Sequence, residues 1–519
     1  IVDTAADNIG GKLLTDTEKK QRQALIAQIK EKGFEQVIEE VAYTWFNRFS
    51  ALRFMEVNGY LPTHVRVFTD EENNFKPQII TEAIHLEMDG LDIEKVYAFK
   101  EADKTEELYK YQLITQCNAL NKILPGMFQR ISDYTELLLP DNLLREGSVI
   151  EQMITLIPED DWKDAVQIIG WLYQFYNIEP KAKVFNRASG IKINKEEISA
   201  ATQLFTPEWI VRYMVENSLG RLWLEGHPNE NLKSEWKYYL DEAVQETGVQ
   251  IQLDAFRAEY KDIKPEDIRC IDPCMGSGHI LVYMFDVLVR IYENYGYTTR
   301  EAVASIIKNN IWGLDIDERA AQLSYFSVMM KARQYDHLFF NKKDGNGNIA
   351  IPQPHIYAIK ESGHTDKDGR RKYEFTKDML DYFSNGDDLL KHDINTLVDD
   401  LFDAKEYGSI LNIHNVDFDA LYSRFEEIEI DVNMYSYPVM NDLLPFVQVA
   451  QVMAQEYEIV ITNPPYLVVS NANAKLYDFV NKNYPDSKAD LFAVFIERCN
   501  KMLSKNGIQS MITIHSWMF

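Results

Sequence analysis

The sequence predicts an α/β protein in which a parallel sheet follows an all-helical N-terminal domain. Apolar residues recur at helical spacing through about the first 180 residues. From Phe205 onward, short apolar strands alternate with amphipathic helices, which is typical of βαβ units on a parallel sheet. Three of these strands run directly into acidic, amide, glycine or proline residues. Because parallel sheets bind ligands at the carboxyl ends of their strands, these loops form the candidate site.

The N-terminal domain is expected to span residues 1–180. Its first part, KKQRQALIAQIKEKGFEQVIEEVAYTWFNRFSALRFMEVNGY, has apolar positions at helical spacing, with breaks at Gly33 and Gly59. Further helical patterns are TELLLPDNLL, VIEQMITLI and WKDAVQIIGWLYQFYN. The aromatic residues of the last stretch recur at helix-like intervals, which predicts that they pack in a helical core.

The second domain is expected to span residues 181–519, with insertions at about 225–266 and 336–450. The first insertion is polar and partly helical. The second contains KKDGNGN and HTDKDGRRK, which are turn-rich surface segments. A further sheet strand is expected at residues 511–515, within GIQSMITIHSWMF.

The composition indicates a soluble globular protein, with 46% hydrophobic and 26% charged residues. No uninterrupted apolar run reaches the roughly 18 residues of a transmembrane helix, and the first residues lack a secretory signal pattern, so no membrane association is expected. The cysteines Cys117, Cys270, Cys274 and Cys499 form no CxxC pair or Cys/His cluster. This predicts reduced thiols in a cytoplasmic protein without a metal site.

The net charge argues against a nucleic-acid partner. The chain has 54 Lys and Arg against 81 Asp and Glu, a formal charge of −27. Nucleic-acid binders usually carry a basic footprint. Either the phosphate contacts are concentrated locally, or a basic part of the protein lies outside this chain.

The stretch IRCIDPCMGSGHILVYMF predicts a strand that ends at Asp272 and a helix that begins at about His279. The loop between them is Pro273, Cys274, Met275, Gly276, Ser277 and Gly278. Its two glycines allow a tight turn and close approach to a ligand. The loop lacks both GxGxxG and the Gly-Lys-Ser/Thr of a P-loop, which disfavours a phosphate-bearing cofactor.

The stretch NIWGLDIDERAAQLS predicts a second strand that ends at Asp315. An acid at this position is placed to accept hydrogen bonds from ribose hydroxyls. Ile316 is positioned to pack on a purine face. For Asp317, at the start of the next helix, capping is the favoured role.

Upstream, AATQLFTPEWIVRYMVENSLGRLW contains Phe205, Thr206 and Pro207. Thr206 and Pro207 are predicted to be the N-cap and first residue of a helix, followed by the first-turn acid Glu208. This reading alone is structural. The segment becomes a candidate for the site because it precedes the glycine loop.

The stretch EIVITNPPYLVVS ends a buried strand in Asn463, Pro464, Pro465 and Tyr466. Each proline fixes φ and removes a backbone donor, so the motif is rigid and cannot continue a sheet ladder. It offers an amide side chain, carbonyl acceptors and an aromatic face at the carboxyl end of a strand.

In this order the four motifs resemble those of the amino-group DNA methyltransferases that use S-adenosylmethionine. That family has a Phe-Thr-Pro segment, an Asp-Pro-x-x-Gly-Ser-Gly loop, an acid after the second strand and Asn-Pro-Pro-Tyr after the fourth. Longer stretches are similar to the PglX family of adenine-specific methyltransferases in BREX phage-defence systems: IEEVAYTWFNRFSALRFMEVN, GWLYQFYN, ATQLFTPEWIVRYMVENSLGRLW and DPCMGSGHIL. This resemblance covers most of the chain.

The resemblance implies a Rossmann-like methyltransferase sheet that uses S-adenosylmethionine to methylate adenine N6 in double-stranded DNA. The catalytic residues would be Asn463, Pro464 and Tyr466, with the two acceptors binding the amine and Tyr466 stacking on the flipped base. The cofactor-binding residues would be Phe205, Thr206, Pro207, Asp272, Pro273, Gly276, Ser277, Gly278, Asp315, Ile316 and Asn463. Other BREX subunits are implied as partners, and a phage-encoded DNA mimic is a candidate inhibitor of the DNA groove.

In that family, further strands and a target-recognition domain follow the catalytic domain, and neither is expected in this chain.

Two other functions stay open. A protein-glutamine methyltransferase also uses Asn-Pro-Pro-Tyr, on an amide nitrogen, although the helical domain and the Phe-Thr-Pro segment argue against it. The other is a DNA-binding or assembly subunit of a defence complex that binds the cofactor without turnover.

Overall fold

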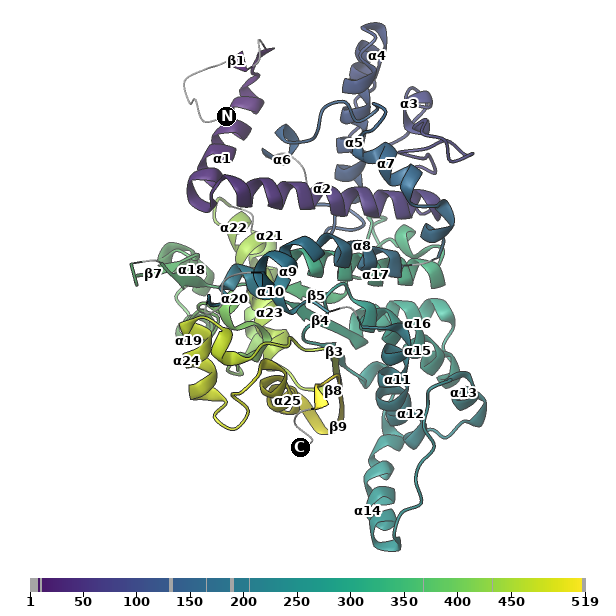
Figure 1. Cartoon of the computed structure of the whole chain (residues 1–519), viewed down its shortest axis with the longest axis vertical. Coiled ribbons are helices and arrows are strands. Elements are labelled where there is room, and N and C mark those ends of the chain that lie inside the picture. The colour runs from purple at the N-terminus through teal and green to yellow at the C-terminus, as the bar shows by residue number, and fades with distance from the viewer. Residues whose placement is uncertain are drawn as a thin grey trace. The chain divides into compact units, whose positions relative to one another are not determined.

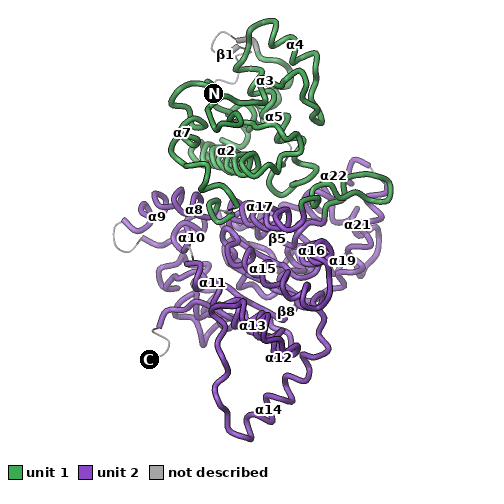
Figure 2. Tube along the Cα trace, turned by 90° about the vertical axis from the view of Figure 1, so that its right-hand side faces the viewer, with its two compact units in different colours: residues 1–169, 337–351 green, residues 170–336, 352–519 purple. Residues whose placement is uncertain are grey.

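The computed structural model describes residues 8–9, 12–129, 134–164, 166–186, 191–204, 206–366, 368–431 and 433–515. The chain divides into two compact units (Figure 2). Unit 1 comprises residues 1–169 and 337–351, and unit 2 comprises residues 170–336 and 352–519. Unit 1 is therefore discontinuous, because it takes a segment from the middle of the chain.

Unit 1 is mainly helical. Its helices are α1 (Asp16–Lys32), α2 (Phe34–Val57), α3 (Gln78–Thr81), α4 (Ile93–Glu101), α5 (Thr105–Leu120), α6 (Tyr134–Leu137) and α7 (Val149–Leu156). A short antiparallel ladder of β1 (Asn8–Ile9) and β2 (Lys12–Leu13) precedes them. The breaks predicted at Gly33 and Gly59 are confirmed, since both adopt positive φ, Gly33 between α1 and α2 and Gly59 just beyond α2.

A buried ion pair lies in the core of unit 1. Arg53 and Glu56 are one turn apart on α2, and both side chains are fully buried, with Arg53 Nη1 and Glu56 Oε1 2.5 Å apart. The other carboxylate oxygen of Glu56 accepts hydrogen bonds from the backbone N–H groups of Val67 and Phe68 at 2.7 and 2.8 Å. Burial raises the pKa of Glu56, and the Arg53 charge opposes that rise. The pair thus joins α2 to the following loop.

Unit 2 contains a five-stranded parallel sheet (Figure 1). The strands are β3 (Cys270–Asp272), β4 (Ile311–Asp315), β5 (His355–Ala358), β8 (Tyr457–Thr462) and β9 (Leu503–Met511), in the order β5-β4-β3-β8-β9. Every neighbouring pair runs parallel. The prediction of a parallel α/β sheet is confirmed.

Two strands differ from their predicted positions. β5 lies inside the segment 336–450 that the sequence assigns to an insertion, yet it pairs with β4 from His355 opposite Trp312 to Ala358 opposite Asp315. Its four residues are too few, and too polar at His355, to form a recognisable apolar run. The predicted strand at residues 511–515 is also wrong, because β9 ends at Met511.

Helices cover both faces of the sheet. Leu314 and Trp312 of β4 belong to the core cluster that also contains residues of α23 (Leu444–Ala454) and α25 (Leu491–Lys501). Gly313 points to the opposite face, where a Cβ atom would lie 2.8 Å from Leu281 of α15 (His279–Tyr295). This alternation along one strand is expected for a sheet that is buried on both sides. It also explains why β4 and β8 are largely apolar and buried.

The other helices of unit 2 lie around this sheet. They are α8 (Gln167–Tyr176), whose first turn belongs to unit 1, α9 (Ile178–Phe185), α10 (Lys195–Thr202), α11 (Glu208–Val215), α12 (Arg221–Gly226), α13 (Glu230–Glu235), α14 (Thr247–Ala258), α16 (Thr299–Ser305), α17 (Glu318–Tyr335), α18 (Lys377–Ser384), α19 (Asp388–Asp400), α20 (Ala404–Tyr407), α21 (Phe418–Ile430), α22 (Ser436–Pro438) and α24 (Ala474–Asn483). The predicted polar insertion 225–266 contains α13 and α14.

The aromatic stretch of residues 162–177 is only partly buried in a core. Trp162 and Tyr173 are buried, but Trp171 is 52% exposed and Phe175 is 68% exposed. The helical period is present, as predicted, but Trp171 and Phe175 are four residues apart and share the outer face of α8. Aromatic residues that recur at helical spacing identify one face of a helix. The spacing does not show whether that face packs against the rest of the protein.

Within the described residues, no helix combines the length and the apolar content that a membrane crossing requires. All four cysteines are free thiols.

Replacing Glu56 by alanine is expected to lower the free energy of unfolding of unit 1 by about 3–5 kcal/mol, because the Arg53 guanidinium stays buried without its nearest carboxylate. Hydrogen exchange of the α2 amides across a urea series measures this loss locally. The matched control is Asp160→Ala, which removes the exposed Asp160–Lys163 pair and is expected to cost less than about 1 kcal/mol. Equal losses in the two variants would contradict the role of the buried pair.

Candidate active site

The two central strands of the sheet bring the glycine loop and the Asn-Pro-Pro-Tyr motif together. β3 and β8 are parallel neighbours, with Cys270 opposite Ile459 and Ile271 opposite Val460. From β3 the sheet continues toward β4, and from β8 it continues toward β9, so the strand order reverses between them. Open α/β sheets bind ligands at such a reversal, outside the carboxyl ends of the strands.

The glycine loop is attached to the acid at the end of β4. Gly276 donates its backbone N–H to Asp315 Oδ2 at 2.9 Å, and Asp317 donates its own to Asp315 Oδ1 at 2.8 Å. Asp272 Oδ1 accepts from the Cys274 N–H at 3.0 Å, which turns the chain directly after β3. A carboxylate offers about four lone-pair sites, so Asp315 keeps acceptor capacity for a ligand.

Position 278 requires glycine for two reasons, its backbone conformation and the lack of room for a side chain. Its φ is +84°, in the left-handed region, and it caps the N-terminus of α15. A Cβ atom here would lie 2.4 Å from Ser324 Oγ and 2.9 Å from Ser324 Cα on α17. The loop therefore passes against α17 only because residue 278 has no side chain.

Two acids of the site have raised pKa values. Burial raises the pKa of Asp272 to about 7, and the nearby Asp315 charge adds to the rise. Burial also raises the pKa of Asp315 to about 7, against the hydrogen bond from Asp317 N–H. A ligand that brings positive charge or hydroxyl donors to these carboxyls would offset the cost of ionising them.

Asp317 caps α17, as predicted. Its Oδ1 accepts from the Arg319 N–H at 2.9 Å. The same carboxylate accepts hydrogen bonds from the Tyr173 hydroxyl at 3.0 Å and the Ser199 hydroxyl at 2.9 Å. Although it is buried, hydrogen bonds and charge from Arg319 lower the pKa of Asp317. This second role, which joins α8 and α10 to the sheet, has no local sequence signal.

The Asn463 side chain is held at both ends. Asn463 Nδ2 donates to Thr206 Oγ1 at 3.1 Å and to the Leu204 carbonyl at 3.4 Å. Asn463 Oδ1 accepts from the Tyr466 hydroxyl at 2.9 Å. The Tyr466 hydroxyl also lies 2.9 Å from the Ile512 carbonyl, just beyond β9. The side chain is therefore positioned by segments far apart in the sequence.

The predicted cap of α11 is wrong by one residue. The N-cap is Pro207, and no side chain caps the helix. Because α11 begins at Glu208, the Thr206 hydroxyl lies one residue too early to cap it and instead accepts the bond from Asn463. Phe205, the third residue predicted in this segment, lies outside the described residues.

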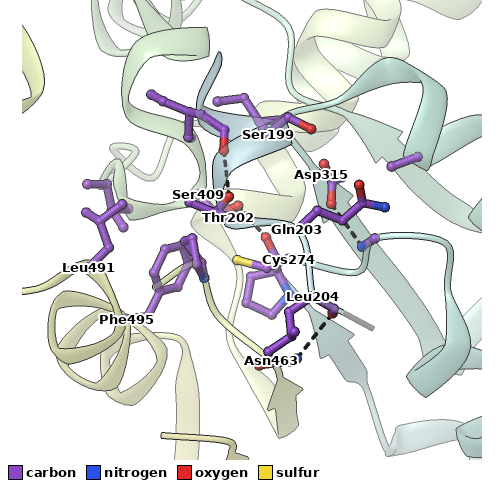
Figure 3. A pocket seen from close by; sticks show the side chains of 18 of the residues that line it. Ser199, Thr202, Gln203, Leu204, Cys274, Asp315, Ser409, Asn463, Leu491 and Phe495 are labelled. Carbon is purple, nitrogen blue, oxygen red and sulfur yellow. Dashed lines mark hydrogen bonds between the residues drawn. The ribbon is translucent and has the colours of Figure 1, made fainter. Parts of the chain in front are cut away.

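One cleft connects these loops (Figure 3). Of the predicted site residues, Pro273, Gly276, Asp315, Ile316 and Asn463 line it. The other described ones belong to the same segments of the chain but do not line the cleft: Thr206, Pro207, Asp272, Ser277, Gly278, Pro464 and Tyr466. The cleft therefore joins the ends of β3, β4 and β8.

Several cleft residues were not predicted. They are Tyr173, Ile198, Ser199, Thr202, Gln203, Leu204, Cys274, Ala320, Glu406, Tyr407, Gly408, Ser409, Ile410, Pro465, Leu476, Leu491 and Phe495. The group from 406 to 410 comes from the predicted insertion. There, Ser409 donates its hydroxyl to the Pro273 carbonyl, and Arg498 of α25 donates Nε–H to the Ser409 carbonyl at 3.1 Å.

Among the residues that the structure describes, no three His, Cys, Asp or Glu side chains are grouped so that they could hold a metal ion.

Residues 309–519 match the Eco57I restriction-modification methylase family. The match begins just before β4 and contains Asp315 and the Asn-Pro-Pro-Tyr motif, whereas the glycine loop precedes it.

Two curated proteins are similar to nearly the whole chain. The adenine-specific methyltransferase BrxX of Escherichia coli O9:H4 (strain HS) is 38% identical over 521 residues, which cover 96% of this chain and 42% of that protein. The adenine-specific methyltransferase PglX of Lacticaseibacillus casei (strain Zhang) is 37% identical over 538 residues, covering 98% and 43%. The chain spans less than half the length of either relative.

Among solved structures, a cryoEM structure of a DrdV–DNA complex aligns with a TM-score of 0.35 and 12% identity, over 96% of this chain and 36% of that one.

The match to a methylase family and the names of the two relatives imply a methyl donor of the S-adenosylmethionine type, and the residues of the cleft fit one. Such a donor carries a positive charge and ribose hydroxyls, and the cleft presents the Asp315 carboxylate with spare acceptor capacity. Gly276 lines the cleft with backbone rather than a side chain.

The affinity for S-adenosylmethionine is expected to rise from about pH 6 to about pH 8, because Asp272 and Asp315 ionise in this range and a cationic ligand binds their charged forms more tightly. Both pKa values are raised above the ordinary 3.8, so ionisation between about pH 4 and pH 7 lowers the stability of the free protein, and binding recovers part of that loss. Calorimetric titration at each pH measures the affinity.

In that titration, Asp315→Asn is expected to weaken binding at pH 8 and to flatten the pH dependence. The control Asp366→Asn removes a partly buried turn carboxylate whose pKa is lowered, and it is expected to leave the dependence intact. A pH-independent affinity in the wild-type protein would contradict the role of the two acids.

Proposed function

We propose that the full-length protein is a site-specific DNA adenine N6-methyltransferase that uses S-adenosylmethionine and acts in bacterial phage defence of the BREX type. The observation that carries this proposal is the Asn463 amide, held at the end of β8 beside the cleft that contains Asp315 and the glycine loop. The names of the two relatives, both adenine-specific methyltransferases, support the same reaction.

The cofactor would lie along the carboxyl ends of β3 and β4. Asp315 would accept hydrogen bonds from the ribose hydroxyls, and Ile316 would pack on the purine. The loop from Asp272 through Pro273, Gly276, Ser277 and Gly278 would pass beside the cofactor, with the Phe205-Thr206-Pro207 segment covering it from α11. When bound, the donor supplies an electrophilic methyl group on a sulfonium, whose sulfur keeps the bonding electron pair as the methyl leaves.

The acceptor would be the exocyclic amine of adenine, a poor nucleophile because its lone pair is delocalised into the ring. Asn463 Oδ1 and the Pro464 carbonyl would accept hydrogen bonds from its two N–H groups and draw the nitrogen toward tetrahedral geometry. The lone pair then points toward the methyl group, so the catalysis comes from positioning and electrostatics. After methyl transfer the nitrogen would release one of these protons to solvent. The two prolines hold these acceptors rigidly, as their fixed φ angles require.

The base must leave the duplex to reach these acceptors. Tyr466 would supply a face on which it stacks. The ring is suited to this role because its hydroxyl is anchored next to both Asn463 and Ile512. The net charge of −27 gives no general attraction for DNA, so we propose that the further length found in the relatives contributes to DNA recognition. Other BREX subunits as partners, and a phage-encoded DNA mimic as an inhibitor, belong to the same proposal.

The test is sequencing of genomic DNA for N6-methyladenine in cells that carry the full-length protein and its system partners. One methylated motif is expected with the wild-type protein, and a loss of at least about 100-fold is expected with Asn463→Ala, because both the acceptor and its geometry disappear.

The control is Asn481→Ala, which removes an exposed amide that bonds only within α24 among the described contacts, and which is expected to keep full methylation. Equal methylation in cells with the wild-type protein and with Asn463→Ala would contradict the DNA methyltransferase assignment. The protein-glutamine methyltransferase and the cofactor-binding scaffold would then be the remaining candidates, separated by whether tritium from the donor enters protein.

A further inference from the structure

The Asn463 side chain can serve a methyl transfer in only one of its two orientations. Its oxygen accepts the hydrogens of an amine, whereas its NH2 group donates hydrogens and would repel them. A rotation of half a turn about the last bond exchanges the two groups at almost no steric cost. Something in the protein must therefore select the orientation with Oδ1 toward the substrate.

The Leu204 carbonyl and the Thr206 hydroxyl occupy the side of the amide away from Tyr466. The Leu204 carbonyl only accepts hydrogen bonds, and it lies 3.4 Å from Asn463 Nδ2 (Figure 3). Thr206 Oγ1 lies 3.1 Å from the same nitrogen. A reversed amide would place its oxygen against the Leu204 carbonyl oxygen, so this carbonyl favours the observed orientation. The Thr206 hydroxyl can both donate and accept, and here it accepts the bond that holds the amide nitrogen on this side.

Tyr466 contacts the other end of the amide in this orientation. Its hydroxyl has one hydrogen and lies 2.9 Å from both Asn463 Oδ1 and the Ile512 carbonyl. It can donate to one acceptor at a time. When an amine hydrogen reaches Oδ1, the hydroxyl can donate to Ile512 instead, so no buried hydrogen bond is lost.

Thr206 is suited to this task by its position. It is only 6% exposed, and its hydroxyl does not cap α11. Leu204 and Thr206 flank a single residue between α10 and α11, and the bond from Thr206 to Asn463 spans 257 residues of sequence. A short segment from the start of unit 2 thus controls the amide at the end of β8.

We propose that Thr206 is a positioning residue for methyl transfer, which acts with the Leu204 carbonyl to point Asn463 Oδ1 at the acceptor amine. This rests on the proposed function. It assigns the Thr206 hydroxyl to the catalytic amide rather than to the cofactor or to the helix cap.

The test compares Thr206→Val with Thr206→Ser in the full-length protein. It measures single-turnover methyl transfer to unmethylated DNA that contains the recognition motif. Valine keeps the shape but removes the acceptor, so the rate is expected to fall about 10- to 100-fold, while the affinity for S-adenosylmethionine stays within about twofold. Serine keeps the hydroxyl and is expected to restore the rate to within about threefold of wild type. Thr396→Val, which removes an exposed hydroxyl bonded to a helix carbonyl on α19, is the control.

Three results would overturn the proposal. A serine variant as slow as the valine variant would indicate a packing role, a parallel loss of cofactor affinity would indicate cofactor binding, and an unchanged rate in Thr206→Val would indicate no role.

A second measurement does not depend on activity. In this chain with nitrogen-15-labelled asparagine, the Asn463 side-chain amide signals are assigned by their absence in Asn463→Asp. Thr206→Val is expected to speed their hydrogen exchange about fivefold, as expected for the loss of one neutral hydrogen bond, and Thr206→Ser to leave it unchanged. If the wild-type protein methylates no DNA, the proposed function fails, and this exchange rate alone decides whether Thr206 orients the amide. Unchanged exchange in Thr206→Val would then reject the inference.

Discussion

The site depends on the parallel pairing of β3 with β8. These strands are distant in sequence, and at their start Arg269 donates its backbone N–H to Glu458, 189 residues away, at 2.8 Å, with a salt bridge at 3.2 Å. Once that register is set, Asp272 and Asn463 must emerge at the same edge of the sheet. The insertion between them can vary in length without moving either residue, because both are fixed by strand geometry rather than by the loops.

The cleft is costly for the free protein. Two carboxyls with raised pKa values lie in one buried region, a tyrosine hydroxyl is shared between two acceptors, and Gly278 adopts a conformation that few other residues tolerate. Each feature reduces stability or freedom without improving the packing. Such features persist where a ligand compensates for them, and here they surround a single cleft.

The sequence predicted the strand-end loops that meet at the cleft better than the rest of the cleft lining. Asp272, Gly276, Asp315 and Asn463 were identified because each follows a strand at a position where local geometry limits the choice of residue. Ser409 and Phe495 were not, since they reach the cleft only through tertiary packing and carry no local pattern. The same reason explains why β5 was missed, why exposed Trp171 was assigned to the core, and why Thr206 was assigned to a helix cap: periodicity and capping rules describe one element at a time.

The discontinuity of unit 1 constrains how the protein is made. Residues 337–351, which include the buried Phe339 and Phe340, belong to this unit but leave the ribosome only after β3, β4 and the helices between them. Unit 1 therefore cannot complete its core while it is the only part synthesised, unlike domains that fold in order from the N-terminus. Cutting the gene at residue 169 would therefore separate this unit from residues 337–351, which include part of its own buried interior.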